Sequence, residues 1–330
     1  VRASNQMHVF ARRYEAELRD AFKMGRWVGR DIAQHIDMAP IAEAIRTKLA
    51  AGAAEKRMPT KNLAAYDEYV RGRFEMSRLT PAALANAQRH FATAISQDPD
   101  FALAYDSLAE VYWYLGYLGF MAPSEAFSSG VMHAMRALEI DNTLGETHAL
   151  LAQYHKQLDY NWSEVDREMA RALELSPTSP VVRTRYAFNA LMPRGYLEAA
   201  AEELEGAVEC DPLSTFVRGH LAIVLVLWHR WNEAIEQARL LLELDPNGVW
   251  GDFVMGVAYR ELRRFEDSIA AHRRALSLSG GSAMLRGWLG LSLALAGKTD
   301  EARALLDGLR EEATRTYVPP TSIAWIHLGL

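Results

Sequence analysis

Residues 207–246 read AVECDPLSTFVRGHLAIVLVLWHRWNEAIEQARLLLELDP, and this stretch begins and ends with related six-residue phrases. Ala207–Pro212 opens it as AVECDP, and Leu241–Pro246 closes it as LLELDP. Proline has no backbone N–H and cannot continue a helix, so each phrase predicts a helix end followed by a turn into a new unit. Each phrase is therefore expected to close one repeated unit of structure.

The phrase recurs along the chain at a nearly constant interval. Its other forms are Ala94–Pro99, Ala137–Asn142, Ala172–Pro177 and Ala275–Gly280. The six final residues stand at 99, 142, 177, 212, 246 and 280, which are 43, 35, 35, 34 and 34 residues apart. Such self-similarity predicts stacked supersecondary units that form one continuous body. The wide first interval holds about nine extra residues, Gly116–Ser124, which predict a longer loop or longer helices as a surface elaboration.

Small residues recur at one position of each unit. They are Ala109, Ala152, Ala187, Ala222, Gly256 and Gly290. We expect them where the two helices of a hairpin cross, because a small side chain lets the backbones approach closely. A large side chain at such a position is expected to cost about 1 to 3 kcal/mol by overpacking.

The repeated pattern resembles the tetratricopeptide repeat (TPR) family, which reads W-x2-L-G-x2-Y, then A-x3-F-x2-A, then Pro. The unit after Pro99, for example, has Tyr105, Leu108, Ala109, Tyr112, Gly130, Ala134 and Ala137 at these positions. The resemblance implies an all-α fold, a right-handed superhelix of stacked antiparallel helix hairpins. Residues 61–330 would hold seven repeats and the first helix of an eighth.

Residues 1–60 lack the repeated phrase. Met7–Tyr14 fits a short strand, and Ile41, Ile45 and Leu49 recur at helical spacing. We expect this segment to be the remnant of a preceding α/β domain with linker helices. Since the chain begins at Val1 and stops inside an apolar helical pattern, we also expect a piece of a longer polypeptide.

Two motifs point to the kind of parent protein. Ala65–Arg73 reads AYDEYVRGR, and Arg78–Pro81 reads RLTP. Both resemble the C-terminal TPR region of bacterial multidomain signalling proteins of the winged-helix regulator, nucleotide cyclase or Ser/Thr kinase types. The resemblance implies an effector domain towards the N-terminus.

Composition narrows the classes of function. Half of the 330 residues are hydrophobic, 24% are charged, and the formal net charge is -6, which gives no general attraction to nucleic acid or anionic lipid. Cys210 is the single cysteine, so one chain can form neither a disulfide nor a cysteine-based zinc site. Apolar runs such as Leu221–Trp228 are shorter than the roughly 20 residues that cross a bilayer. We expect a cytoplasmic protein; a periplasmic location would need an upstream transmembrane helix in the parent chain.

The sequence predicts no catalytic, cofactor or metal site. It lacks the phosphate-binding, nucleophile-elbow and zinc-protease motifs. His148 and His155 lie seven residues apart on one expected helix, but they occupy packing positions of the repeat, and no carboxylate or thiol is expected to complete a ligand set. We therefore interpret both as core histidines and expect no enzyme activity.

Partner binding is expected in the concave groove, which the first helix of each hairpin lines. The predicted groove residues are Trp113, Phe188, Phe216, Ile223, Trp250, Phe253, Val257 and Arg260. Most of them are apolar, which predicts a protein-interaction scaffold or regulatory module that holds an apolar peptide or helix from another protein or from the parent chain. For each residue, packing between hairpins is an equal alternative. For the whole array the alternatives are a homodimerising structural module or an enzyme region acting on a polymer.

Overall fold

The computed structural model describes residues 59–330. The chain divides into two compact units, Val1–Leu63 and Ala64–Leu330, and the second is the one described below. The expected α/β remnant and linker helices fall on residues 1–58, outside the described range. Within residues 59–330 there are fifteen α-helices and no strand, which confirms the all-α class predicted from the sequence.

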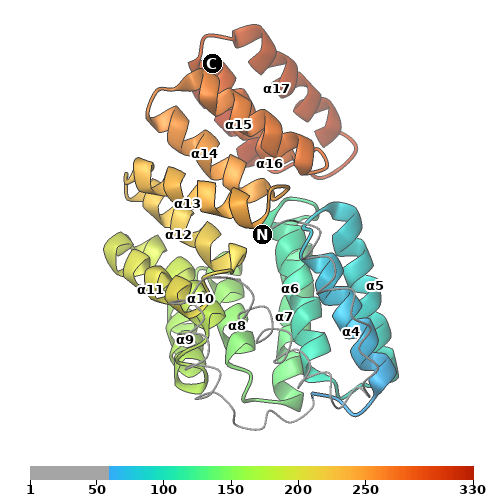
Figure 1. Cartoon of the computed structure of the whole chain (residues 1–330). Helices are drawn as coiled ribbons and strands as arrows, with labels where there is room; N and C mark the ends of the chain where they lie inside the picture. The colour runs from blue at the N-terminus through green and yellow to red at the C-terminus, as the bar shows by residue number, and fades with distance from the viewer. Residues whose placement is uncertain (1–58) are drawn as a thin grey trace, which may run out of the picture. The chain divides into compact units, whose positions relative to one another are not determined.

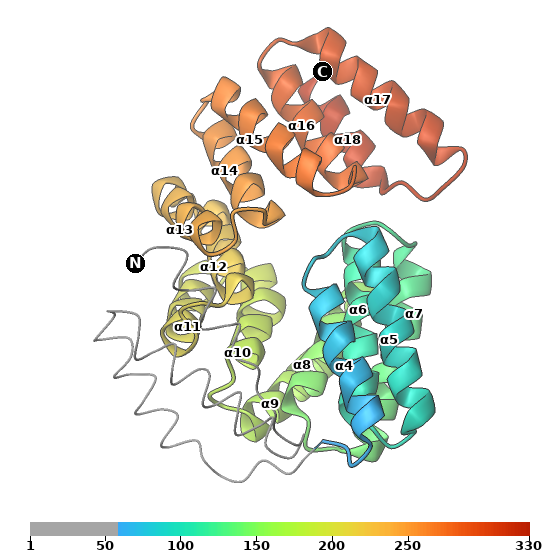
Figure 2. The same ribbon diagram turned by 45° about the vertical axis from the view of Figure 1, so that its right-hand side comes forward.

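The helices form consecutive antiparallel hairpins (Figures 1 and 2). The first three pairs are α4 (Leu63–Met76) with α5 (Pro81–Gln97), α6 (Ala102–Tyr117) with α7 (Pro123–Ile140), and α8 (Gly145–Leu158) with α9 (Trp162–Leu175). In the fourth pair α10 (Pro180–Tyr186) continues into a π-helical turn η2 (Ala187–Leu191) and a 3₁₀ turn η3 (Met192–Arg194), followed by α11 (Leu197–Cys210). The remaining helices are α12 (Thr215–Leu227), α13 (Trp231–Leu244), α14 (Val249–Glu261), α15 (Phe265–Leu278), α16 (Ala283–Leu295), α17 (Thr299–Ala313) and α18 (Pro320–Gly329).

Each hairpin packs on the next through its second helix. Thus α5 contacts α6, α7 contacts α8, and the same relation holds through α15 and α16, while α18 packs on α16 and α17. Figure 2 shows the opening helices of successive hairpins following one another along the inner side of the array. The result is the expected superhelix, in which an isolated hairpin would leave an apolar face open and neighbours cover it.

Small residues at the helix crossings explain how closely the hairpins nest. Ala109, Ala152, Ala187 and Ala222 are fully buried, as predicted. A Cβ added to Gly256 would lie 2.5 Å from the His272 ring. These positions therefore have room for hydrogen or methyl groups only, which ties the spacing of small residues to the spacing of the helices.

The residues inserted in the second hairpin do more than elaborate the surface. They lengthen α6 and α7 and form the loop between them, where Leu118 and Phe120 join an apolar cluster that also contains Met76 and Trp250. Gly119, at a left-handed φ of 75°, is in contact with Pro319 of the α17–α18 loop. The expectation of a mere surface elaboration is wrong, because the loop joins hairpins far apart in the sequence.

Candidate functional site

A cavity of about 320 Å³ lies on the inner side of the array, and we call it the inner cavity. Its walls come mainly from opening helices: α4, α6, α8, α10 with η2, α12 and the start of α14. A second cavity of about 410 Å³, here the turn cavity, lies between the α4–α5 turn and the loops that begin α14 and α16. The two cavities share Ser77, Leu79, Thr215 and Trp250 in their walls.

Six of the eight predicted groove residues line these cavities. Trp113, Phe188, Phe216, Ile223 and Trp250 line the inner cavity, and Trp250 and Phe253 line the turn cavity. Val257 and Arg260 line neither. Val257 is buried, and the Arg260 guanidinium lies over the Trp288 ring at 4.7 Å with its Nη2 2.7 Å from the Glu261 carboxylate.

The aromatic walls are held in place by packing behind them. Trp113 stacks on Phe127 at 5.1 Å between ring centroids and meets Tyr154 edge-on at 5.8 Å. Only 6% of Trp113 and 7% of Phe188 are exposed. Trp113 and Phe188 therefore pack in the core and also line the cavity. For these two residues, groove lining and packing between hairpins are compatible.

Charged side chains form one side of the inner cavity. Glu110 accepts a hydrogen bond of 2.9 Å from Arg73 and another of 2.9 Å from Arg185. Arg185, only 5% exposed, also donates to the Glu146 carbonyl at 2.9 Å. Removing Glu110 would leave the buried Arg185 without its carboxylate partner, and breaking a buried pair in this way typically costs about 3 to 5 kcal/mol. The three side chains thus fix how hairpins one, two and four face one another across the cavity.

Asp106 lies one helical turn before Glu110 and is also buried. Its Oδ1 accepts a 2.7 Å hydrogen bond from the Thr147 hydroxyl. The pKa of Asp106 is raised to about 6, chiefly by burial and then by the nearby Glu110 carboxylate, while Arg185 and the hydrogen bond from Thr147 act in the opposite direction. This carboxyl therefore changes charge close to neutral pH.

A second polar group lies near Phe188. The buried Lys156 ammonium donates to the Asn189 side-chain oxygen at 2.8 Å, and no carboxylate within residues 59–330 is hydrogen-bonded to it. Burial lowers the Lys156 pKa to about 8. Asn189 in turn donates to the Arg185 carbonyl at 3.0 Å, four residues earlier and just before the π-helical turn η2. This bond stabilises the turn that carries Phe188.

His220 behaves as an aromatic side chain at this site. Its Nδ1 lies 2.7 Å from the Phe216 carbonyl, and its ring meets Phe188 edge-on at 4.7 Å. Burial lowers the pKa of His220 to about 4. The ring is therefore neutral at physiological pH and extends the apolar wall between Phe188 and Phe216.

Sequence reasoning missed several polar residues in or beside the cavity wall: Arg73, Arg185, Lys156, Asn189 and His220. One signal was available. Arg185 precedes the predicted groove residue Phe188 by three positions, which places both on one helix face. The pairing of Arg185 with a carboxylate 75 residues earlier has no local sequence signal.

The interpretation of His148 needs correction. A carboxylate does lie beside it: the His148 Nδ1 is 2.6 Å from Glu168 Oε2, and the side chain is partly exposed. It makes a hydrogen-bonding contact across the third hairpin where a core histidine was expected. Within residues 59–330 no cluster of three or more His, Cys, Asp or Glu side chains is arranged to hold a metal ion.

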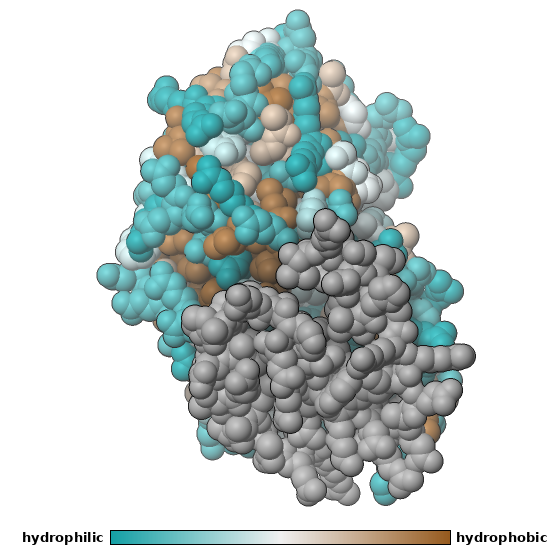
Figure 3. All heavy atoms as spheres, in the orientation of Figure 1, coloured by the Kyte–Doolittle hydropathy of each residue, from teal (hydrophilic) through white to brown (hydrophobic). Residues whose placement is uncertain are grey.

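No helix in the described range combines the length and apolar character needed to span a membrane. The face drawn in Figure 3 shows apolar residues scattered among hydrophilic ones over the later hairpins. The apolar walls described above belong instead to the interior of the array.

Comparison of the sequence with known proteins gives one group of similar proteins. No family model matches the sequence. The chain is similar to the transcriptional regulator HilA of Salmonella typhimurium and of Salmonella typhi, with 26% identity over 144 residues. The matches cover 44% of this chain and 26% of the regulators, so the chain spans about a quarter of the length of the curated relatives it matches.

Solved structures resemble the chain over more of its length. A monomeric IFIT1 mutant with Gppp-AAAA aligns with 95% of this chain and 72% of its own, with a TM-score of 0.66 and 13% identity. The APC/C hetero-tetramer Cut9–Hcn1 aligns with 81% of this chain and 55% of its own, with a TM-score of 0.51 and 14% identity. The fold is a TPR-like helical solenoid. At these identities the likeness concerns the fold of the solenoid alone.

Proposed function

We propose that the solenoid is a protein-interaction module whose inner cavity holds an apolar segment of a partner protein or of the parent chain. One observation carries the proposal: Trp113, Phe188, Phe216, Ile223 and Trp250 come from four opening helices and converge on a single cavity. Its volume of about 320 Å³ is at the lower end of the roughly 300 to 1,000 Å³ typical of ligand pockets. It accommodates a few side chains of a longer segment.

The polar groups of the cavity would orient the bound segment. The Arg73 side chain is 45% exposed although it pairs with Glu110, so its guanidinium has donors left for a peptide carbonyl. Apolar walls with a few fixed polar groups are the usual design of a binding pocket. The segment would bury its apolar side chains against Phe188 and Phe216 while its backbone meets the Arg73 side.

The setting we propose is a larger bacterial regulator. The likeness to the transcriptional regulator HilA supports this setting, and so do the AYDEYVRGR and RLTP motifs at Ala65–Arg73 and Arg78–Pro81. In such a protein the module would recruit a partner or hold another part of the same chain.

A cavity-filling substitution tests the proposal. A Cβ added to Gly219, which lines the inner cavity on α12, meets no atom within 4 Å. Gly219→Leu should therefore fill the cavity while the protein stays folded. Gly308→Leu is the matched control, because Gly308 is exposed on α17 and also has open space around it.

The measurement uses peptides selected from a displayed random library on the whole protein. We expect Gly219→Leu to weaken the selected peptides at least tenfold and Gly308→Leu to leave their affinity unchanged, with both melting temperatures followed by circular dichroism. Equal affinity for folded Gly219→Leu and wild type, or no selectable peptide, would contradict the proposal.

A further inference from the structure

Four aromatic side chains form a row along the later opening helices, which we call the aromatic row: Trp250 and Phe253 on α14, Trp288 on α16 and Trp325 on α18. Neighbouring ring centroids lie 5.7, 5.8 and 4.2 Å apart, so the contact is continuous from one hairpin to the next. All four side chains are partly exposed. Trp288 and Trp325 were not among the predicted groove residues.

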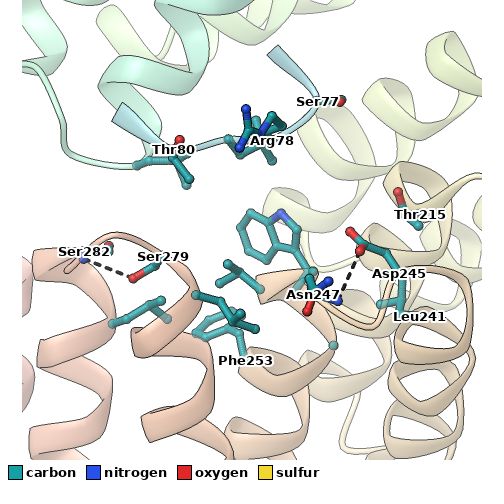
Figure 4. A pocket seen from close by; sticks show the side chains of 18 of the residues that line it. Ser77, Arg78, Thr80, Thr215, Leu241, Asp245, Asn247, Phe253, Ser279 and Ser282 are labelled. Carbon is teal, nitrogen blue, oxygen red and sulfur yellow. Dashed lines mark hydrogen bonds between the residues drawn. The ribbon is translucent and has the colours of Figure 1, made fainter. Parts of the chain in front are cut away.

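Two of the three ring contacts in the row are steep, whereas Trp288 and Trp325 are inclined by 36°. Phe253 meets Trp250 at 76° and Trp288 at 73°. Edge-to-face rings leave wedges between ring faces, whereas parallel stacks would leave none. Figure 4 shows Phe253 at the wall of the turn cavity, facing Arg78 and Thr80 across it, so the beginning of the row opens into a hollow.

The indoles of the row have unused hydrogen-bond donors. Among the described residues none accepts a hydrogen bond from the N–H of Trp250, Trp288 or Trp325. These three nitrogens are not fully buried, whereas the Trp231 nitrogen is buried without a partner. An indole N–H is a donor only. A ligand along the row should therefore present acceptors without donors of its own at these points.

Arg260 fixes the middle of the row. Its guanidinium lies 4.7 Å from the Trp288 ring centroid, and its Nε and Nη2 both donate to one carboxylate oxygen of Glu261, at 3.2 and 2.7 Å. The Trp325 ring also packs against Trp288, at 4.2 Å between centroids and 36° between planes, so Trp288 offers a ligand its edge with the indole N–H. The indole is thus set in orientation before anything binds.

We infer that the aromatic row binds an extended, proline-rich segment in the polyproline II conformation; this inference rests on the proposed function, since it names the class of segment bound. A polyproline II segment has no internal hydrogen bonds, so its carbonyls are free to accept from the indoles. An α-helix uses its carbonyls internally and would leave the same donors unpaired. Two polyproline II residues span about 6 Å, close to the spacing of Trp250, Phe253 and Trp288.

A nucleic acid strand also stacks on aromatic side chains, but the charges near the row give its phosphates no net attraction. On the hairpin that carries Trp250 and Phe253, the Asp252 carboxylate pairs with Arg274 and the Glu261 carboxylate pairs with Arg260. The formal net charge of the chain is -6, which gives phosphate binding no general support, whereas an uncharged proline-rich segment needs none.

The test compares dye-labelled peptides by fluorescence anisotropy on the whole protein. One peptide repeats Pro-Pro-Leu between Ser-Gly ends, a second has every proline replaced by alanine, and an amphipathic helical peptide and a single-stranded oligoadenylate complete the set. We expect the proline-rich peptide to bind at least tenfold more tightly than the other three. Equal or tighter binding of the helical peptide or of the oligoadenylate would overturn the inference.

A matched pair of substitutions locates the binding. Trp288→Phe keeps a ring and removes the donor, and Trp228→Phe does the same at an indole that also has an arginine, Arg230, at 4.7 Å but lies outside the row. Loss of one hydrogen bond should weaken the proline-rich peptide about twofold to tenfold in Trp288→Phe and leave it unchanged in Trp228→Phe. Equal effects of the two would overturn the inference.

The outcomes separate the two proposals. If the helical peptide binds, is blocked by Gly219→Leu, and outcompetes the proline-rich peptide, the proposed function stands and the inference about the aromatic row fails. If no peptide of any class binds the folded protein, both fail.

Discussion

The raised pKa of Asp106 makes the stability of the protein depend on pH. It is buried beside Glu110, and its pKa is raised from an ordinary value near 3.8 to about 6. In the unfolded chain this carboxyl ionises near its ordinary pKa, so between about pH 4 and pH 6 the folded state binds the proton and the unfolded state does not. Ionisation of Asp106 therefore lowers the free energy of unfolding as the pH rises from about 4 to about 6.

A substitution isolates this effect. Asp106→Asn keeps an oxygen that can accept from the Thr147 hydroxyl, and it cannot ionise. We expect its stability relative to wild type to rise between pH 4 and pH 6, by about 1 to 3 kcal/mol in total at the ordinary cost of about 1.4 kcal/mol for each pKa unit. Chemical denaturation at a series of pH values measures it. A difference between the two proteins that is the same at every pH would contradict the assignment.

At the scale of the helix, Gly130 and Gly308 are a contrasting pair. A Cβ on Gly130 of α7 would overlap the hydroxyl of Tyr154, which donates a buried 2.6 Å hydrogen bond to the Ala109 carbonyl. Gly130→Ala should therefore destabilise the protein by about 1 to 3 kcal/mol through overpacking. Gly308→Ala on α17 meets nothing and should stabilise by about 0.5 to 1 kcal/mol, because alanine favours the helix. The denaturant midpoints of both variants and of the wild type measure these effects. A Gly130→Ala variant as stable as the wild type would show that the hairpins are packed less closely than described.

Contacts within one repeat could be predicted from the sequence. The helix pattern was accessible because small residues such as Ala109 and Ala222 and the closing prolines act within one repeat, where spacing along the chain decides contact. The eight groove residues follow in the same way from position on an opening helix, and six of them line the two cavities. Val257 lines neither cavity and is buried. Partner binding by these residues stays a prediction.

For the whole molecule, the decisive contacts join hairpins far apart in sequence. Glu110 binds Arg185 across 75 residues, Gly119 touches Pro319, and Trp250 packs in a cluster with Met76. Such pairs depend on how much each hairpin rotates against the last, and that rotation accumulates along the array. No local pattern encodes it. The cavities and the charged side of the inner cavity could consequently not be predicted from the sequence.

We expect the inner cavity, rather than the outer surface, to take the partner segment. Site-specific photo-crosslinking can locate the segment, with a benzophenone amino acid placed at Ile223 in the cavity or at the exposed Met132 of α7, and with a library-selected peptide as the target. A crosslinked product should form from position 223 and disappear with excess unlabelled peptide, and none should form from position 132. Crosslinking from position 132 without any from position 223 would show that the segment binds the outer surface instead.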